Sequence, residues 1–108
     1  MEINEYQKFT ATTAIYPEAN LGTLGEFAYL ALGLTGEAGE VAEKVKKRIR
    51  DGTYDKELFT KELGDVFWYL SRLCTAVGVN AGDVLQQNYD KLTKRKETGN
   101  LKGSGDSR

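Results

Sequence analysis

Residues Leu32–Arg50, with the sequence LGLTGEAGEVAEKVKKRIR, and Lys61–Tyr69, KELGDVFWY, carry the pattern on which the fold prediction depends. Both stretches are helical in pattern, and each has two acids three positions apart. These acids are Glu37 and Glu40 in the first stretch and Glu62 and Asp65 in the second. Because residues three apart on an α-helix lie about 60° apart around its axis, each pair can approach one point. Four carboxylates that converge would favour a hard cation.

Helical patterns also account for the rest of the chain. We expect helices over residues 4–15, 24–51, 55–77 and 81–96. The predicted caps and stops are Asn4 with Gln7, Thr23 with Glu26, Asp51–Gly52, Gly78, and Asn80 with Asp83. Strict alternation of apolar and polar residues is absent, so no strand is predicted. The predicted fold class is all-α: a compact bundle of four, at most five, helices with antiparallel neighbours.

One domain is expected over residues 1–98, followed by a flexible tail over residues 99–108 that is rich in Gly, Ser, Asn, Lys and Asp. The third predicted helix has apolar residues on more than one side, as in a helix that is covered twice. A chain of 108 residues buries only about two-thirds of its unfolded surface on folding. We therefore expect a homo-oligomer, either a dimer or a dimer of dimers.

The composition excludes several kinds of chemistry. The chain has no histidine and a single cysteine, Cys74, which rules out a disulfide framework, a Cys/His zinc site and histidine acid–base catalysis. A net charge of -1 gives no overall attraction to nucleic acid or to an anionic membrane. Because neither a long apolar segment nor a basic-then-apolar leader is present, we expect a cytoplasmic protein.

Each acidic pair has a simpler explanation, because charged helices usually owe their acids to a solvated face. That explanation fits the second pair less well. Asp65 is followed directly by Val66, Phe67 and Trp68, and an unpaired carboxylate next to such an apolar stretch would be costly. Oxygen ligands without histidine or thiol favour Mg²⁺, or Mn²⁺, and magnesium rarely binds to protein alone without a phosphate group that shares it.

A basic face on the fourth predicted helix could hold such phosphates. Asn88, Lys91 and Arg95 follow one another at spacings of three and four residues, which places them on one side of a helix. One amide and two cations suit a polyphosphate. The alternative is a solvated basic helix end that complements the helix dipole. Lys44, one turn beyond Glu40, presents the same choice.

The ordered combination of these motifs resembles the MazG-like nucleotide pyrophosphohydrolases of the all-α NTP pyrophosphatase superfamily. It consists of Glu37-x-x-Glu40, Glu62-Leu63-Gly64-Asp65 and Asn88-x-x-Lys91-Leu92-x-x-Arg95, and the resemblance covers roughly residues 24–97. The GEAGE form is similar to the short, phage-type branch. One departure is Gly36, which stands where many members have a further glutamate.

The resemblance implies a house-cleaning hydrolase that depends on Mg²⁺. It would cleave a (d)NTP between the α- and β-phosphates into (d)NMP and pyrophosphate. The implied metal ligands are Glu37, Glu40, Glu62 and Asp65, and Glu40 is our choice for the residue that orients the attacking water. The expected substrate-binding residues are Asn88, Lys91, Arg95, Lys44, Trp68 and Tyr69. In the family, assembly of subunits also completes the site.

Alternatives remain open at several of these positions. Trp68 and Tyr69 could stack on a nucleobase, or belong to the core or a subunit interface. In the tail, Asp106 and Arg108 could fold over a bound nucleotide as a lid. The enzyme could act on phosphoribosyl-ATP or another nucleotide, and the chain could instead be a non-catalytic helical interaction module.

Overall fold

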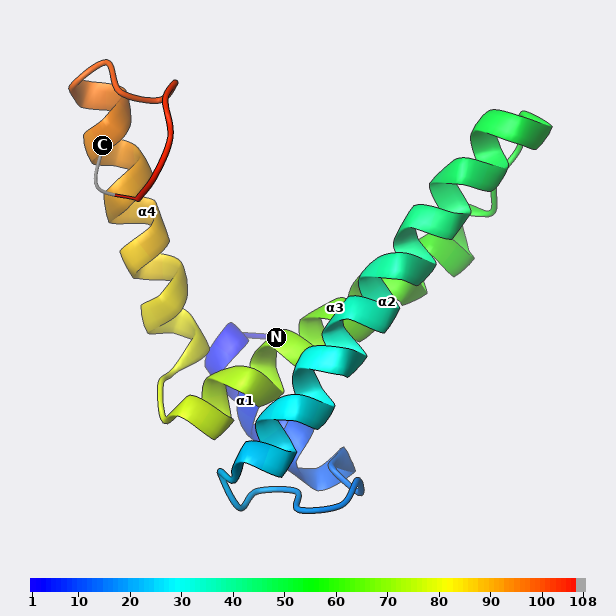
Figure 1. Cartoon of the computed structure of the whole chain (residues 1–108), viewed down its shortest axis with the longest axis vertical. Coiled ribbons are helices and arrows are strands. Elements are labelled where there is room, and N and C mark those ends of the chain that lie inside the picture. The colour runs from blue at the N-terminus through cyan, green and yellow to red at the C-terminus, as the bar shows by residue number, and fades with distance from the viewer. Residues whose placement is uncertain (107–108) are drawn as a thin grey trace.

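The structure, a computed structural model, describes residues 1–106, and helices are the only regular secondary structure in that range. Helix α1 (Ile3–Thr10) continues into a short 3-10 turn (Ala11–Thr13), and the long helices are α2 (Leu24–Asp51), α3 (Lys56–Val77) and α4 (Ala81–Glu97). The prediction of an all-α fold with four helices is confirmed (Figure 1). None of the helices among the described residues is long and apolar enough to cross a membrane.

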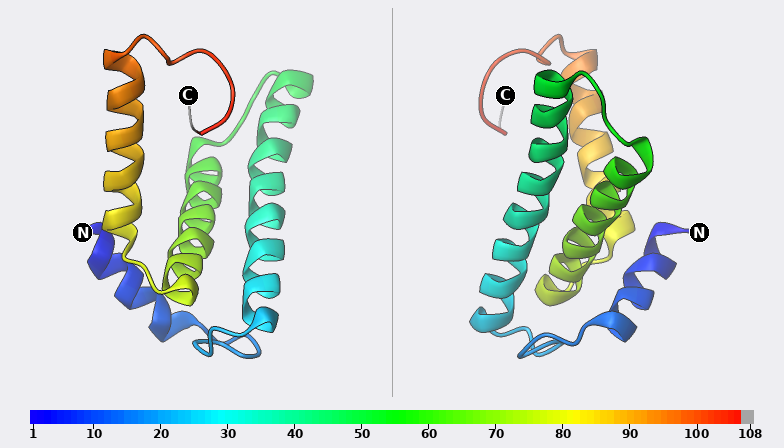
Figure 2. Two further views of the ribbon diagram at one scale, coloured as in Figure 1. Left: turned by 60° about the vertical axis from the view of Figure 1, so that its left-hand side comes forward. Right: turned by 90° about the vertical axis from the view of Figure 1, so that its right-hand side faces the viewer.

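Helices α2 and α3 form an antiparallel hairpin, as the short connection between them predicts (Figure 2). Thr23 caps α2 by accepting a hydrogen bond from the amide of Glu26, 3.2 Å long. Asp55 caps α3, where its carboxylate accepts from the amides of Glu57 and Leu58. The two helices approach closely at Gly33, because a Cβ atom there would collide with the ring of Tyr69. Any larger residue at this position would force the Tyr69 ring to move.

The predicted compact bundle is wrong, because α4 does not pack along the hairpin. Gly78 ends α3 in the left-handed conformation, with φ of 80°, and α4 then leaves at a steep angle, so that the molecule has the shape of a V (Figure 1). The radius of gyration is 16.6 Å. A compact domain of this length would have about 13 Å. One arm of the V is α2 with α3, and the other is α4.

Helix α1 lies in the corner of the V, where it joins both arms, and its predicted extent and cap are wrong. The helix ends at Thr10 rather than near Ile15, and no side chain caps its start. Instead, Gln7 accepts a 2.6 Å hydrogen bond from the amide of Ala81 and donates one of 2.8 Å to the carbonyl of Val79. Asn4 accepts from the amide of Gly82, at 2.9 Å.

Gln7 and Asn4 cap α4 in place of Asn80, which was predicted to do so. Asn80 occupies the N-cap position of α4 but makes no capping hydrogen bond with its side chain. The start of α4 is thus capped by α1, seventy or more residues earlier in the sequence.

Few apolar side chains are buried within the described chain. The buried apolar residues are Tyr16, Leu30 and Ala81, and the other fully buried side chains include Glu26 and Arg72. One side of α3 packs against α2 and α1. The opposite side, with Phe67 and Leu70, stays largely exposed. Helix α3 was predicted to be buried on two sides, and within the described chain only one side is buried.

Residues 99–106 turn back along α4, on the side that faces the α2–α3 arm (Figures 1 and 2). The last two residues of the predicted tail lie outside the described residues. These include Arg108, which was part of the predicted lid.

Candidate functional site

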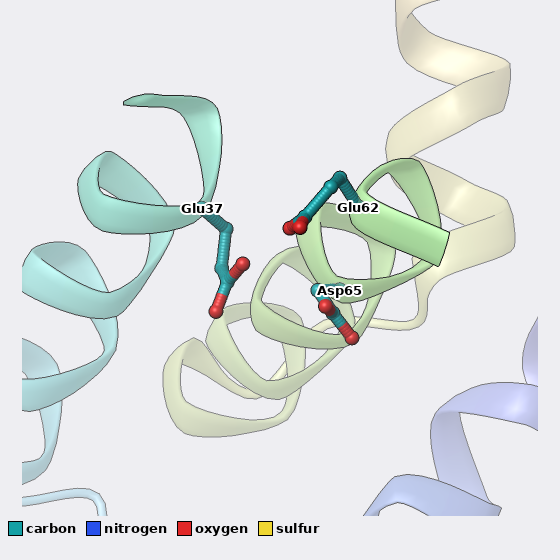
Figure 3. A group of neighbouring side chains, drawn as sticks. All are labelled: Glu37, Glu62 and Asp65. Carbon is teal, nitrogen blue, oxygen red and sulfur yellow. The ribbon is translucent and has the colours of Figure 1, made fainter. Parts of the chain in front are cut away.

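Three of the four predicted metal ligands converge between α2 and α3. One carboxylate oxygen each of Glu37, Glu62 and Asp65 lies within 4.8 Å of the other two. Figure 3 shows Glu37 on α2 facing Glu62 and Asp65 on α3. Glu37 and Glu62 are half-buried and Asp65 is exposed, so the cluster opens to solvent. Oxygen atoms at such spacing match the ligands of a hard divalent cation.

The electrostatics of Glu37 show the cost of bringing these charges together. Burial raises the pKa of the Glu37 carboxyl above its ordinary value, and the negative charges of Asp65, Glu62 and Glu40 raise it further. A hydrogen bond with Glu62 acts in the same direction. A bound cation would lower the pKa of Glu37, because its positive charge would offset the repulsion between the carboxylates. The residues present therefore fit a metal centre.

Glu40, the fourth predicted ligand, lies one turn beyond Glu37 on α2 and is exposed. It is not part of the group of three among the described residues, although its charge contributes to the raised pKa of Glu37. Lys44 is half-buried one turn further along the same helix. The roles predicted for both residues stay predictions.

The glycines around the acids behave differently from Gly33. A Cβ atom at Gly36 or Gly39 would meet no other atom within 4 Å, so nothing in the described chain approaches the helix there. Helix α2 is nevertheless continuous through both positions. The described chain therefore offers no packing reason for glycine at either position.

The aromatic residues predicted to bind substrate contact other side chains of the chain. Trp68 donates a 2.8 Å hydrogen bond from its indole Nε1 to Thr13, and its ring meets that of Tyr69 edge to face, with centroids 5.0 Å apart. Tyr69 packs on Gly33. Burial raises the pKa of Tyr69, and the charges of Glu37 and Asp65 also raise it. The aromatic residues thus adjoin the acidic cluster, in packed positions.

The residues of the predicted basic face lie on α4, which forms the other arm of the V. Asn88 lies on the exposed middle of α4, and Lys91 and Arg95 follow toward its C-terminal end. Within one chain the structure does not bring these residues to the acidic cluster (Figure 1). Lys91 and Arg95 instead form ion pairs with Asp106 of the tail, at 3.2 Å each.

Sequence reasoning missed a buried polar network that joins α2, α3 and the 16–22 loop. Arg72 and Glu26 are almost fully buried and form an ion pair, with 3.7 Å between Nη2 and Oε2. The Tyr16 hydroxyl donates a hydrogen bond to Glu26 and accepts one from Arg72. The backbone amide of Asn20 also donates to Glu26, and its side-chain oxygen accepts from Arg72. Burial alone would raise the pKa of Glu26, but the hydrogen bonds and the charge of Arg72 lower it overall.

A signal for this network was present in the sequence. Arg72 interrupts an otherwise apolar stretch of the third helix, and a charged residue in such a position needs a buried partner. Only the first half of the predicted capping box at Thr23 forms, because the Glu26 carboxylate accepts from Tyr16, Asn20 and Gly22 instead.

Comparisons with known proteins identify the family of the chain. The family described as the MazG nucleotide pyrophosphohydrolase domain matches residues 26–99. The Gene 37 protein of Mycobacterium phage L5 is 42% identical over 114 aligned positions, which cover all of both chains. No solved structure matches significantly. The matched range contains the three clustered acids, Glu40 and the basic face of α4, and the chain belongs to the MazG nucleotide pyrophosphohydrolase family.

Proposed function

We propose that the chain is a Mg²⁺-dependent nucleoside triphosphate pyrophosphohydrolase, which cleaves the bond between the α- and β-phosphates and releases a nucleoside monophosphate and pyrophosphate. The convergence of Glu37, Glu62 and Asp65 in a chain of this family carries the proposal. These three residues would hold the metal, with Glu40 beside them. A bound divalent cation supplies positive charge for the phosphates and makes a bound water more acidic.

The residues of the chain would divide the remaining tasks. Glu40 is exposed and outside the group of three, which leaves its carboxylate free to orient or deprotonate the attacking water. Lys91 and Arg95 would neutralise the outer phosphates, and Asn88 would bind phosphate or sugar. Lys44 is a further phosphate ligand in this scheme. Trp68 and Tyr69 would form the wall against which the base or sugar packs.

The separation of the two arms supports a site that is shared between chains. The acids stand on one arm and the basic face on the other, so a second copy is needed to bring α4 to the cluster. Apolar residues exposed on both arms would be covered in such a dimer; they include Phe67, Leu70, Leu85, Tyr89 and Leu92. At the corner between the arms, an apolar cavity of about 120 Å³ lies beside Phe67, Leu70 and Val84. We therefore propose a homodimer, or a dimer of dimers, as the active form.

The central experiment is a panel of the eight common NTPs and dNTPs with Mg²⁺, in which the phosphorus-containing products are identified. Monophosphate with pyrophosphate is the expected pair, and diphosphate with phosphate would contradict the assigned bond. Glu62→Gln should lower the rate on the order of a hundredfold or more, because it removes a charged metal ligand. Glu57→Gln, on the same helix but outside the cluster, is the matched control and should leave the rate unchanged.

A further inference from the structure

The C-terminal tail covers the basic face of α4. Its Asp106 carboxylate lies 3.2 Å from Lys91 Nζ and 3.2 Å from Arg95 Nη2, and one oxygen, Oδ1, makes both contacts. The Asp106 side chain itself is 84% exposed, whereas the side chain of Arg95 is only 5% exposed. The tail therefore brings a solvent-facing negative charge onto two cations, one of which is buried.

The backbone of the tail is shaped for this contact. The amide of Asn100 donates a 2.7 Å hydrogen bond to the carbonyl of Arg95, which starts the reversal of the chain after α4. Gly105 has a φ of 80°, in the left-handed region that favours glycine. In this conformation the Gly105 carbonyl and the Asp106 carboxylate both accept from Nη2 of the same arginine. Two acceptors thus lie side by side against one guanidinium edge.

The arrangement resembles a partly filled anion site. Nε of Arg95 is buried and has no hydrogen-bond partner among the described residues, so the guanidinium is incompletely satisfied by the tail. A phosphate carries three terminal oxygens and more negative charge than a carboxylate, and it would satisfy the guanidinium more completely. Hydrogen bonds from Lys91 and then Arg95 lower the pKa of Asp106, as do their charges, so its carboxyl stays ionised at neutral pH.

We propose that Asp106 is a built-in competitor of the substrate, whose carboxylate occupies the anion site of Lys91 and Arg95 until nucleotide phosphates displace it. This inference rests on the proposed function, since it assigns a resting occupant to the same phosphate-binding residues. It also differs from a lid, because a lid would close on bound substrate and a competitor leaves. The two ideas predict opposite effects when Asp106 loses its charge.

The test is the affinity for inorganic pyrophosphate in the absence of metal, measured by titration of the full chain. Asp106→Asn should bind pyrophosphate about threefold to tenfold more tightly than the unaltered chain, the range expected for removal of one or two partly exposed ion pairs. With NTP and Mg²⁺, KM should fall by a similar factor while kcat stays constant. In NMR spectra, pyrophosphate should shift the Gly103 and Gly105 amide signals of the unaltered chain toward those of residues in random coil.

Asp90→Asn is the matched control, because Asp90 lies on α4, accepts a hydrogen bond from Gln86 and, within the described part of the chain, forms no ion pair with Lys91 or Arg95. It removes the same charge and should leave the pyrophosphate affinity unchanged. Equal or weaker binding by Asp106→Asn, or a fall in kcat, would overturn the inference, and so would the absence of pyrophosphate binding in every variant. If Asp106→Asn released pyrophosphate from NTP but bound pyrophosphate and NTP no more tightly than the unaltered chain, the competitor role of Asp106 would be wrong and the proposed function would stand. Tighter binding without any release would reject the proposed function and keep the anion site.

Discussion

At Glu37, partial burial and the charges of three neighbouring acids together raise the pKa of one carboxyl. A carboxyl whose folded-state pKa is raised destabilises the fold once the pH rises above the pKa of the unfolded chain, because the unfolded state then loses its proton more easily. Below that pH both states are protonated and the penalty disappears. In the absence of metal, Glu37 therefore weakens the fold at neutral pH, as a ligand prepared for a cation would.

Glu37→Gln should consequently raise the melting temperature of the metal-free protein at neutral pH by roughly 2–5 °C, and the gain should vanish in mild acid. Added Mg²⁺ should stabilise the unaltered chain more than the variant, because only the former keeps the full ligand set. Thermal unfolding in EDTA and in Mg²⁺ at two pH values measures both effects. A variant that is less stable than the unaltered chain in EDTA would contradict this account of the cluster.

Single residues also mark the limits of prediction from sequence. The acids Glu37, Glu62 and Asp65 were predictable, because their spacing places them on helix faces that an antiparallel hairpin brings together. The hydrogen-bond partners of Gln7 and Asn4 could not be predicted. These side chains bond to the amides of residues 81 and 82, and local sequence carries no signal for such distant contacts. The local pattern predicted that Asn80 caps α4, whereas residues of α1 form that cap.

At the scale of the element, α1 holds the two arms of the V in place. Its Gln7 contacts Thr75 of α3, the carbonyl of Val79 in the turn and the amide of Ala81 at the start of α4. Helix starts leave amides without intrahelical partners, so this side chain both caps α4 and ties it to α3. The bounds of α2 and α3 followed from their caps and glycines, whereas the direction of α4 depends on this tertiary contact.

Gln7→Ala should lower the free energy of unfolding by about 1–3 kcal/mol, because it leaves a buried amide and a carbonyl without partners. Urea unfolding followed by circular dichroism measures the change. Lys8→Ala, an exposed neighbour on the same helix, serves as control and should alter stability far less. If the two variants were equally stable, α1 would not be the clamp that the hydrogen bonds indicate.

At the scale of the whole molecule, the arms place acids and cations apart, which makes a shared site testable by mixing two inactive chains. A chain with Asp65→Asn lacks an acid, and a chain with Lys91→Ala and Arg95→Ala lacks the cations. If each site takes its acids from one protomer and its cations from the other, mixed dimers contain one intact site. An equal mixture should then recover about a quarter of the unaltered activity.

Recovery is measured by pyrophosphate release after the two chains are unfolded together and refolded, with each variant refolded alone as control. No recovery from a mixture that demonstrably contains mixed dimers would show that acids and cations act within one chain. The open V could not be predicted from sequence, since apolar faces that stay exposed in one chain have the same pattern as faces buried within it.

The buried pair of Arg72 and Glu26 has a consequence for the alignment of the hairpin. Glu37 lies eleven residues beyond Glu26 on α2, or about 16 Å along the axis, and Glu62 lies ten residues before Arg72 on α3, or about 15 Å. The near equality means that the ion pair fixes the register in which the acids meet. A slip by a single residue would separate the pair and rotate Glu37 by about 100° away from its neighbours. The buried ion pair thus sets the alignment of the acidic cluster, which lies about three turns away along the hairpin.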